Sequence, residues 1–150
     1  MVAPILEGRA DLVIGSRVLG GASRKALLPQ ARLGNALACA LIGVLFGARP
    51  TDLGPFRAIR VDALKHLCMR DLDYGWTVEM QLKARVARLC IVEVRVRYRP
   101  RIGVSKVTGT VLGSLRAGLK ILAWIIGWRL KLGFPGPRIP RFRGSAHSGC

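Results

Sequence analysis

The heptapeptide Thr51-Asp52-Leu53-Gly54-Pro55-Phe56-Arg57 places one carboxylate on a tight turn between two predicted regular elements. Glycine and proline shortly after Asp52 favour a turn over a helix or a strand. The uncharged residues 33–46 before it predict a helix that Pro50 closes, and residues 56–60 predict a strand. A carboxylate held in this way could take a proton from a bound acceptor or align it. An ordinary Asx turn is the structural alternative.

The elements around this turn alternate between strands and helices, which predicts a mixed α/β fold. Residues 92–98 alternate valine or tyrosine with charged side chains and give the clearest strand pattern. The other predicted elements are a helix over 2–7 ended by Gly8, a strand over 11–15, a short helix to residue 67 capped by Asp62, and a helix over 76–89. We divide the chain into an α/β domain over 1–104, a helix over 105–132 and a disordered Gly-, Pro- and Arg-rich tail over 133–150.

The charge of the chain is extreme, with a formal net charge of +17 over 150 residues. Between Lys83 and Arg143, fifteen lysines or arginines stand against a single acid, Glu93. Such a field attracts polyanions, among them nucleic acids, anionic lipid head groups and diphosphates. A general bias towards arginine is the alternative explanation, because nineteen arginines accompany only six lysines. Aromatic residues make up 6% and no recognition motif is present, which argues against nucleic acid.

Two arginines are placed where a phosphate could bind. Arg17 follows a predicted strand end, where α/β folds present groups to ligands. Arg32 precedes Leu33 and would lie near a helix N-terminus, where backbone amides and a guanidinium together suit an anion. Solvated surface arginines are the alternative for both.

Further candidate residues follow along the chain. Trp76 could stack on a sugar or lipid, or anchor the core. Glu79 could bind a sugar hydroxyl, or serve as a first-turn charge that the helix dipole favours. The string Arg101-Ile102-Gly103-Val104-Ser105-Lys106 combines a forked donor, a hydroxyl and a point charge on a glycine-bearing loop. These groups suit the neutralisation of a diphosphate leaving group.

The predicted C-terminal helix is amphipathic. A helical wheel places Lys106, Arg116, Lys120 and Lys131 on one side, with Leu115, Leu119, Leu122 and Ile126 opposite. Such a helix, with Trp124 and Trp128 near its end, suits an anionic membrane surface. Packing of the helix on its own domain is the alternative.

Three strings, at 51–57, 74–79 and 101–106, together resemble the acceptor-side half of a family 2 glycosyltransferase of the polyprenyl-phosphate, dolichyl-phosphate mannosyltransferase-like kind. The resemblance covers residues 10–132 and is specific as an ordered set. It implies a GT-A fold, a nucleotide-diphosphate sugar donor, a divalent metal (Mg or Mn) and inversion at the anomeric carbon. It also implies that Asp52 is a base or an acceptor-aligning residue. The implied phosphate contacts are Arg17, Arg32, Arg101, Ser105 and Lys106. Arg99 is the alternative to Arg101 as the equivalent arginine.

The nucleotide-binding half of that family, with its acidic loop and Asp-x-Asp metal motif, has no counterpart among these residues. We therefore expect the chain to be the C-terminal, acceptor-side portion, and to bind neither metal nor donor on its own. Asp71 and Asp73 mimic the motif, but they follow the first acceptor string rather than precede it.

The expected function of the complete enzyme is transfer of a sugar to a lipid phosphate. The alternative is a non-catalytic fragment that only associates with a membrane or a partner chain. The four cysteines lack metal-ligand spacing, and residues 1–20 carry no signal-peptide pattern. The sequence therefore predicts a cytoplasmic location, peripheral to the inner face of the membrane.

Overall fold

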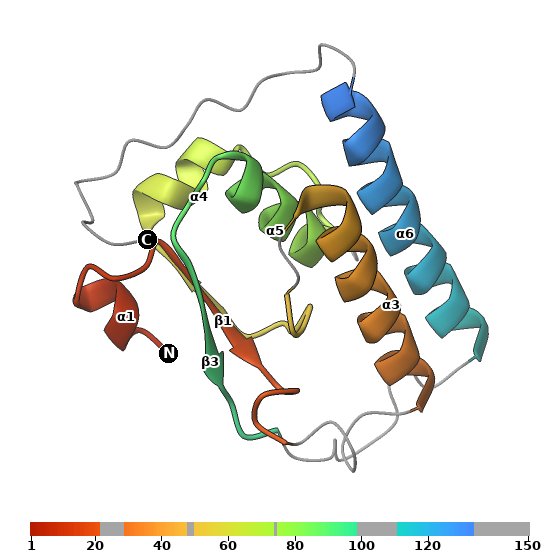
Figure 1. The fold of residues 1–150 in the computed structure, drawn as a ribbon, viewed down its shortest axis with the longest axis horizontal. Helices are drawn as coiled ribbons and strands as arrows, with labels where there is room; N and C mark the ends of the chain where they lie inside the picture. Colours follow the sequence, from red (N-terminus) through yellow and green to blue (C-terminus); the bar gives the residue numbers. More distant parts are fainter. Residues whose placement is uncertain (22–28, 48–49, 74, 99–110, 134–150) are drawn as a thin grey trace.

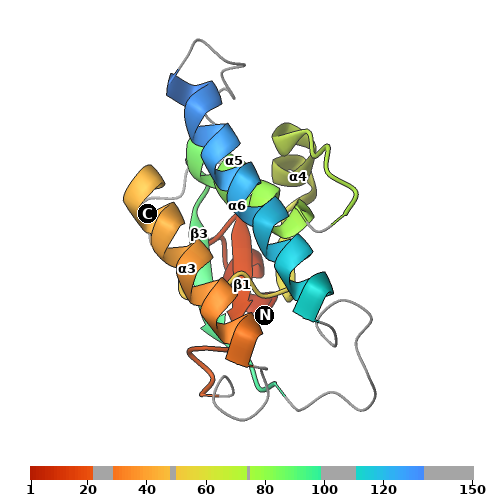
Figure 2. The same cartoon turned by 90° about the vertical axis from the view of Figure 1, so that its right-hand side faces the viewer.

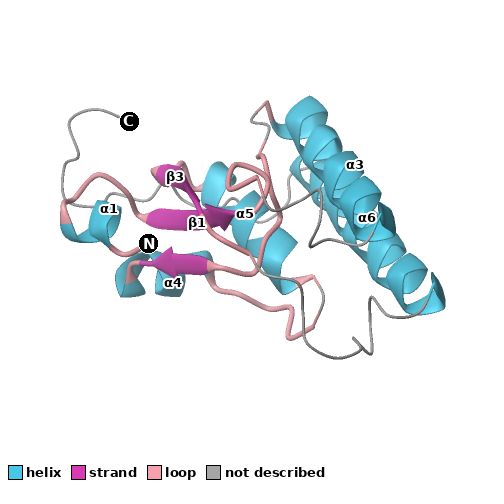
Figure 3. Ribbon diagram, turned by 90° about the horizontal axis from the view of Figure 1, so that it is seen from below, coloured by secondary structure: helices cyan, strands magenta, loops and turns pink. Residues whose placement is uncertain are grey.

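A mixed three-stranded sheet forms one side of the molecule. The computed structural model of the chain describes residues 1–21, 29–47, 50–73, 75–98 and 111–133. Within these, the strand order is β2-β1-β3. The central strand β1, Leu12–Ser16, is antiparallel to β2, Arg57–Ile59, and parallel to β3, Ile91–Arg95 (Figures 1 and 3). The predicted mixed α/β class is confirmed, and it is consistent with part of a glycosyltransferase-like α/β fold.

The sequence of β1 explains its central place. All five of its residues are buried, and Leu12, Val13 and Ile14 have no exposed surface. A strand covered on both faces is apolar on consecutive residues rather than on alternate ones. The register pairs Leu12 with Ile59 on one side and with Ile91 on the other, so an apolar row crosses the whole sheet.

Helix α5, Trp76–Val86, lies between the sheet and an outer pair of helices, α3, Pro29–Phe46, and α6, Val111–Gly133 (Figures 1 and 2). One core cluster joins β1 to Met80 and Ala84 of α5 and to the short helix α4, Val61–Leu67. A second joins Val78 and Leu82 of α5 to α3 and α6. The remaining helix, α1, covers Ala3–Leu6.

Because α5 is covered on both sides, its polar residues are buried with its apolar ones. Every residue from 78 to 84 is buried, including Glu79, Gln81 and Lys83. A buried polar group without a partner costs about 1–3 kcal/mol, so each of these side chains must be bonded inside the protein. Gln81, for example, donates a hydrogen bond to the backbone carbonyl of Asp52.

Several helix boundaries differ from those predicted, among them the end of α5, at Val86 rather than at residue 89. Helix α3 begins at Pro29 rather than at residue 33, and proline is favoured at the start of a helix because its φ is already helical. It ends at Phe46, before Gly47 with φ 71°, a conformation that glycine adopts without strain. The prediction that Asp62 caps α4 is wrong. Arg60 is the N-cap residue, and Asp62 lies in the first turn, 2.6 Å from the Arg60 guanidinium.

The packing face of α6 also differs from the one predicted. Ile125 is fully buried, and Ile121 and Trp128 pack beside it against α3 and α5. Leu119 and Ile126, predicted on the apolar face, are exposed. The helix therefore packs on its own domain with one apolar stripe and exposes another.

The predicted basic side of α6 is divided in the same way. Arg116 is exposed, whereas Lys120 is turned towards the loop before α5, where its Nζ lies 2.8 Å from Asp73 Oδ2 and 3.6 Å from Asp71 Oδ2. This ion pair raises the pKa of Lys120. Lys120, predicted on the basic side of the helix, is therefore not a free charge, because it pairs with aspartates of its own domain at the protein surface. The side chains of Lys131 and of residue 115, and all of Lys106, lie outside the described residues.

Candidate functional site

Topology brings two segments of the sequence together at one end of the sheet. Because β1 and β2 run antiparallel, the residues that precede β2 lie beside the residues that end β1. The turn over 51–54 therefore meets Ser16 and Arg17. The carboxyl end of a strand in an α/β sheet is where ligands bind most often.

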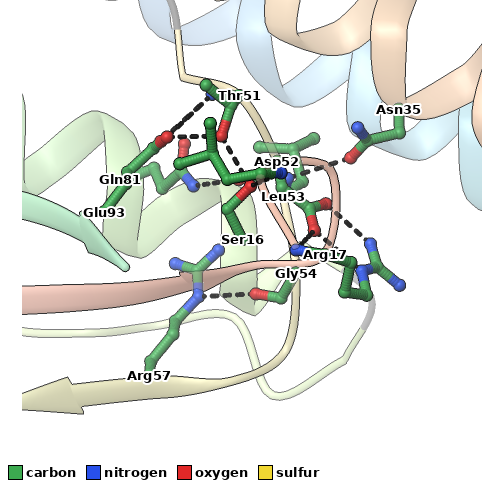
Figure 4. A network of polar contacts seen from close by, with 11 residues as sticks. Ser16, Arg17, Asn35, Thr51, Asp52, Leu53, Gly54, Arg57, Gln81 and Glu93 are labelled. Carbon is green, nitrogen blue, oxygen red and sulfur yellow. Dashed lines mark hydrogen bonds and ion pairs between the residues drawn. The ribbon is translucent and has the colours of Figure 1, made fainter. Parts of the chain in front are cut away.

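Arg17 and Asp52 form the centre of this region (Figure 4). The Asp52 carboxylate accepts three hydrogen bonds from Arg17: from the backbone N–H at 2.9 Å, from Nε at 2.8 Å and from Nη2 at 2.7 Å. Asp52 has no exposed surface, and the Arg17 side chain keeps 14% of its own. The bond to Asp52 raises the pKa of Arg17, and the Arg17 guanidinium also lies 5.5 Å from the centre of the Tyr98 ring.

This geometry bears on the two roles considered for Asp52. In this arrangement the Asp52 carboxylate has no exposed surface, and both of its oxygens accept bonds from the Arg17 guanidinium rather than facing an acceptor. It can hold Arg17 in one orientation, since the two side-chain bonds form the bidentate fork that guanidinium and carboxylate groups favour. The arrangement favours alignment over general base catalysis.

The backbone of the turn is fixed by two amide side chains from different helices. Asn35 of α3 accepts the Leu53 N–H at 2.9 Å, and Gln81 of α5 donates to the Asp52 carbonyl at 3.0 Å (Figure 4). Gly54 fits with little space to spare. A Cβ on this residue would lie 3.0 Å from both Asp52 Oδ2 and the Gly15 carbonyl. These contacts restrain the backbone of the turn.

A row of hydroxyl groups runs beside the charged pair. The Ser16 and Thr51 oxygens are 2.7 Å apart. Thr51 donates its hydroxyl to the Glu93 carboxylate, and its backbone N–H lies 3.1 Å from Oε1 and 3.2 Å from Oε2 of the same group. The sequence pattern placed Glu93 on the polar face of its strand. In the structure, the Glu93 side chain contacts the Asp52 turn through Thr51. Strand β3 ends at Arg95 rather than at residue 98.

Arg57 forms hydrogen bonds with both the Asp52 turn and the start of α5. Its Nε donates to the Gly54 carbonyl at 3.1 Å and its Nη1 to the Thr77 carbonyl at 2.6 Å. Burial lowers the pKa of Arg57 to about 10, which leaves it cationic at neutral pH. Its Nη2 is buried and has no hydrogen-bond partner among the described residues.

The other predicted site residues are dispersed. Arg32 is exposed on α3, one turn before Asn35, which holds the Asp52 turn. Trp76 begins α5, beside the Arg57 contact, and is 37% exposed, so it is not a core anchor. Glu79 is fully buried, and its carboxylate binds the Arg70 and Asp71 N–H groups and Lys83. Glu79 therefore has a structural role in this part of the protein, and its contact with a sugar stays a prediction. Arg101, Ser105 and Lys106 lie outside the described residues.

The described residues do not fit a divalent metal ion. None of them form a group of three or more His, Cys, Asp or Glu side chains that could hold one. The closely spaced pair Asp71 and Asp73 already binds the ammonium group of Lys120. We derive no chemistry through a metal on this part of the chain.

Sequence patterns gave no site role to several residues that hold the Asp52 turn, among them Asn35, Gln81 and Glu93. Each of these three holds backbone of the Asp52 turn from 18 to 42 residues away. Only Glu93 carried a signal, because it is the single acid within a strongly basic stretch. Asn35 and Gln81 resemble any other polar residue of a helix.

Fold and site together define a class: a mixed α/β protein with an arginine fixed by a buried carboxylate at a strand end. Three curated mycobacterial proteins, each named an uncharacterized glycosyltransferase, are similar to this chain: one from Mycobacterium bovis and two from strains of Mycobacterium tuberculosis. Each is 39% identical over 67 residues, which is 44% of this chain and 31% of the relative's own length. No protein-family model matches the chain, and no solved structure does. The similarity supports a glycosyltransferase.

Proposed function

We propose that this chain is the acceptor-side part of an inverting family 2 glycosyltransferase of the polyprenyl-phosphate kind. The complete enzyme would transfer a sugar from a nucleotide-diphosphate donor to a lipid phosphate. A donor-binding part outside these residues would supply the nucleotide site and the divalent metal. The observation that carries the proposal is the Arg17–Asp52 pair, with three hydrogen bonds and a fully buried carboxylate at the end of β1.

The chemistry of a phosphate acceptor suits this pair. A phosphate monoester is already anionic, so the acceptor needs a cation to hold it rather than a base to deprotonate it. Arg17 has five side-chain N–H groups, of which Asp52 takes two. Tyr98 also forms a hydrogen bond with the Arg17 side chain. We expect the N–H groups that neither residue engages to bind the anion at the partly exposed end of the side chain, with Arg32 at the start of α3 as a second positive charge.

The outer helices support a membrane partner. Both expose large apolar side chains: Leu33, Leu37 and Val44 on α3, and Leu119, Ile126 and Leu130 on α6. Exposed arginines accompany them on both helices. Helix α3, at 18 residues and a mean hydropathy of 1.2, is the one helix of the described part long and apolar enough to cross a membrane. Apolar side chains mixed with arginines suit an anionic bilayer surface. We place the protein in the cytoplasm, at the inner face of the membrane.

A second candidate is a non-catalytic chain that only associates with the membrane. The same exposed side chains favour it. The two candidates differ in whether Arg17 serves a reaction.

The test is sugar transfer in membranes from cells that make the natural polypeptide containing this chain. Radiolabelled nucleotide-diphosphate sugars and a polyprenyl monophosphate are added, and label is followed into the lipid phase. We expect transfer to the monophosphate but not to the free polyprenol. Arg17→Ala should lower it about a hundredfold, the usual loss when a group that stabilises a charged reactant is removed. Arg9→Ala, at an exposed arginine paired with Glu7, is the control and should leave transfer unchanged. Equal rates in both variants, or no transfer with any sugar, would favour the non-catalytic candidate.

A further inference from the structure

Two hydroxyl side chains lie directly before the two charged residues of the candidate site. Ser16 precedes Arg17, Thr51 precedes Asp52, and the two hydroxyl oxygens are 2.7 Å apart. Glu93 of β3 completes the set by accepting both the backbone N–H and the hydroxyl of Thr51. A hydroxyl pair and a charged pair therefore join the same two segments (Figure 4).

The direction of each hydrogen bond follows from Glu93. A carboxylate offers acceptors only, so the Thr51 hydroxyl donates to it and accepts the proton of Ser16. The Ser16 oxygen accepts in turn the backbone N–H of Leu19, at 3.1 Å. The chain of donors thus runs from Leu19 through Ser16 and Thr51 to Glu93, and each bond polarises the next.

This row of bonds holds Arg17 from both sides. Ser16 precedes Arg17, and Leu19 follows it two residues later, so the backbone on each side is tied to one oxygen atom. On the other segment, Glu93 accepts the backbone N–H of Thr51, one residue before Asp52. The bonds join residues 35 and 42 positions apart, which no local turn could do.

We propose that Glu93 is a positioning residue, which acts through Thr51 and Ser16 to fix the Arg17–Asp52 pair in the orientation that receives an acceptor phosphate. The identity of that ligand rests on the proposed function, whereas the fixing of the pair does not. Glu93 makes its bonds to Thr51 and not to Asp52 or Arg17. Without this row of bonds, the ion pair would be the remaining side-chain link between Arg17 and the turn.

The decisive experiment compares two variants of Thr51 in the full chain. Thr51→Val keeps the shape of the side chain and removes the hydroxyl, whereas Thr51→Ser keeps the hydroxyl. NMR spectroscopy with ¹⁵N-labelled arginine measures how fast the Arg17 Nε–H exchanges with water. We expect exchange about five- to tenfold faster in Thr51→Val, the effect of losing about one net hydrogen bond, and no change in Thr51→Ser. An unchanged Arg17 rate in Thr51→Val would overturn the proposal. So would equal acceleration of Arg17 and of core amides such as Leu12, because that is general destabilisation.

Glu93→Gln tests the carboxylate itself, with Glu7→Gln as the matched control. Both changes remove one negative charge, but Glu7 is exposed and pairs with Arg9. We expect Glu93→Gln to behave like Thr51→Val, and Glu7→Gln to behave like the unchanged chain. If Glu93→Gln does not fold, the two Thr51 variants still decide the question.

Binding of farnesyl phosphate to the same samples separates this inference from the proposed function. We expect Thr51→Val to bind it about fivefold more weakly than the unchanged chain, again about one hydrogen bond. Farnesol should bind both equally. Faster Arg17 exchange in Thr51→Val without any farnesyl phosphate binding would support the positioning role and count against the lipid-phosphate acceptor. Unchanged exchange in Thr51→Val, with sugar transfer that Arg17→Ala abolishes, would overturn the positioning role alone.

Discussion

Replacing Asp52 by asparagine should lower the free energy of unfolding by about 3 kcal/mol. The substitution keeps the size of the side chain and one acceptor oxygen, but removes the charge that faces Arg17. The amide NH₂ then points at a guanidinium that also only donates, so one of the two side-chain bonds is lost.

The magnitude follows from burial. Breaking a buried ion pair by removing one partner costs about 3–5 kcal/mol. Asp52 has no exposed surface, which favours the full cost, but Arg17 keeps 14% of its side chain exposed and also contacts the Tyr98 ring. We therefore expect the lower end of the range. A domain of ordinary stability, about 5–15 kcal/mol, would remain folded after this loss.

Urea unfolding followed by circular dichroism measures the effect. With a slope of about 2 kcal/mol per molar urea, the midpoint should fall by about 1.5 M. The control is Asp62→Asn, which removes an aspartate paired with Arg60 but largely exposed to water, and it should shift the midpoint far less. The double variant Arg17→Met/Asp52→Asn should lose less than the sum of its single changes. A shift for Asp52→Asn no larger than that for Asp62→Asn would refute the reasoning, because the carboxylate would then not be buried against Arg17.

The remaining predictions concern the helices and the turn. Arg116→Gln should weaken binding to anionic liposomes about fivefold, since each basic group near such a surface contributes about 1 kcal/mol, whereas Lys120→Gln should change it little. Equal losses in cosedimentation would mean that Lys120 also faces the membrane. Gly54→Ala should cost about 1–3 kcal/mol in urea unfolding, because its Cβ would lie 3.0 Å from two oxygen atoms. Gly118→Ala, in a helix with open space around it, should stabilise by up to about 1 kcal/mol, and the opposite ranking would contradict the structure. Lys83→Met should cost about 3 kcal/mol in thermal unfolding, because it leaves a buried carboxylate unpaired; a loss near zero would argue that the pair is hydrated.

Local chemistry made much of the fold predictable. The turn around Asp52 follows from Gly54 and Pro55, and the buried strand β1 follows from consecutive apolar residues. The start of α3 at Pro29 could also have been predicted from the sequence, because proline is favoured in the first turn of a helix.

The partners of Asp52 were not predictable from local pattern. Arg17 was expected to contact a phosphate, and only the antiparallel pairing of β1 with β2 brings it against Asp52, 35 residues away. Helix α6 shows the same limit. A wheel identifies apolar stripes, but it cannot tell which stripe packs on α3 and α5, and Ile125 rather than Ile126 is buried. Asp62 was placed at a cap because aspartate favours that position, whereas the extended backbone of Arg60 sets the boundary one residue before the helix.

For the proposed phosphate ligand, the fixed orientation of Arg17 has a consequence for the rate of binding. A free arginine side chain has about 2 kcal/mol of rotamer entropy, and it loses much of it when it binds. In this protein most of that loss takes place on folding, because Asp52 already holds the guanidinium. An anion that arrives at the strand end meets a donor that needs no conformational search. Dissociation, rather than association, should then distinguish a good ligand from a poor one.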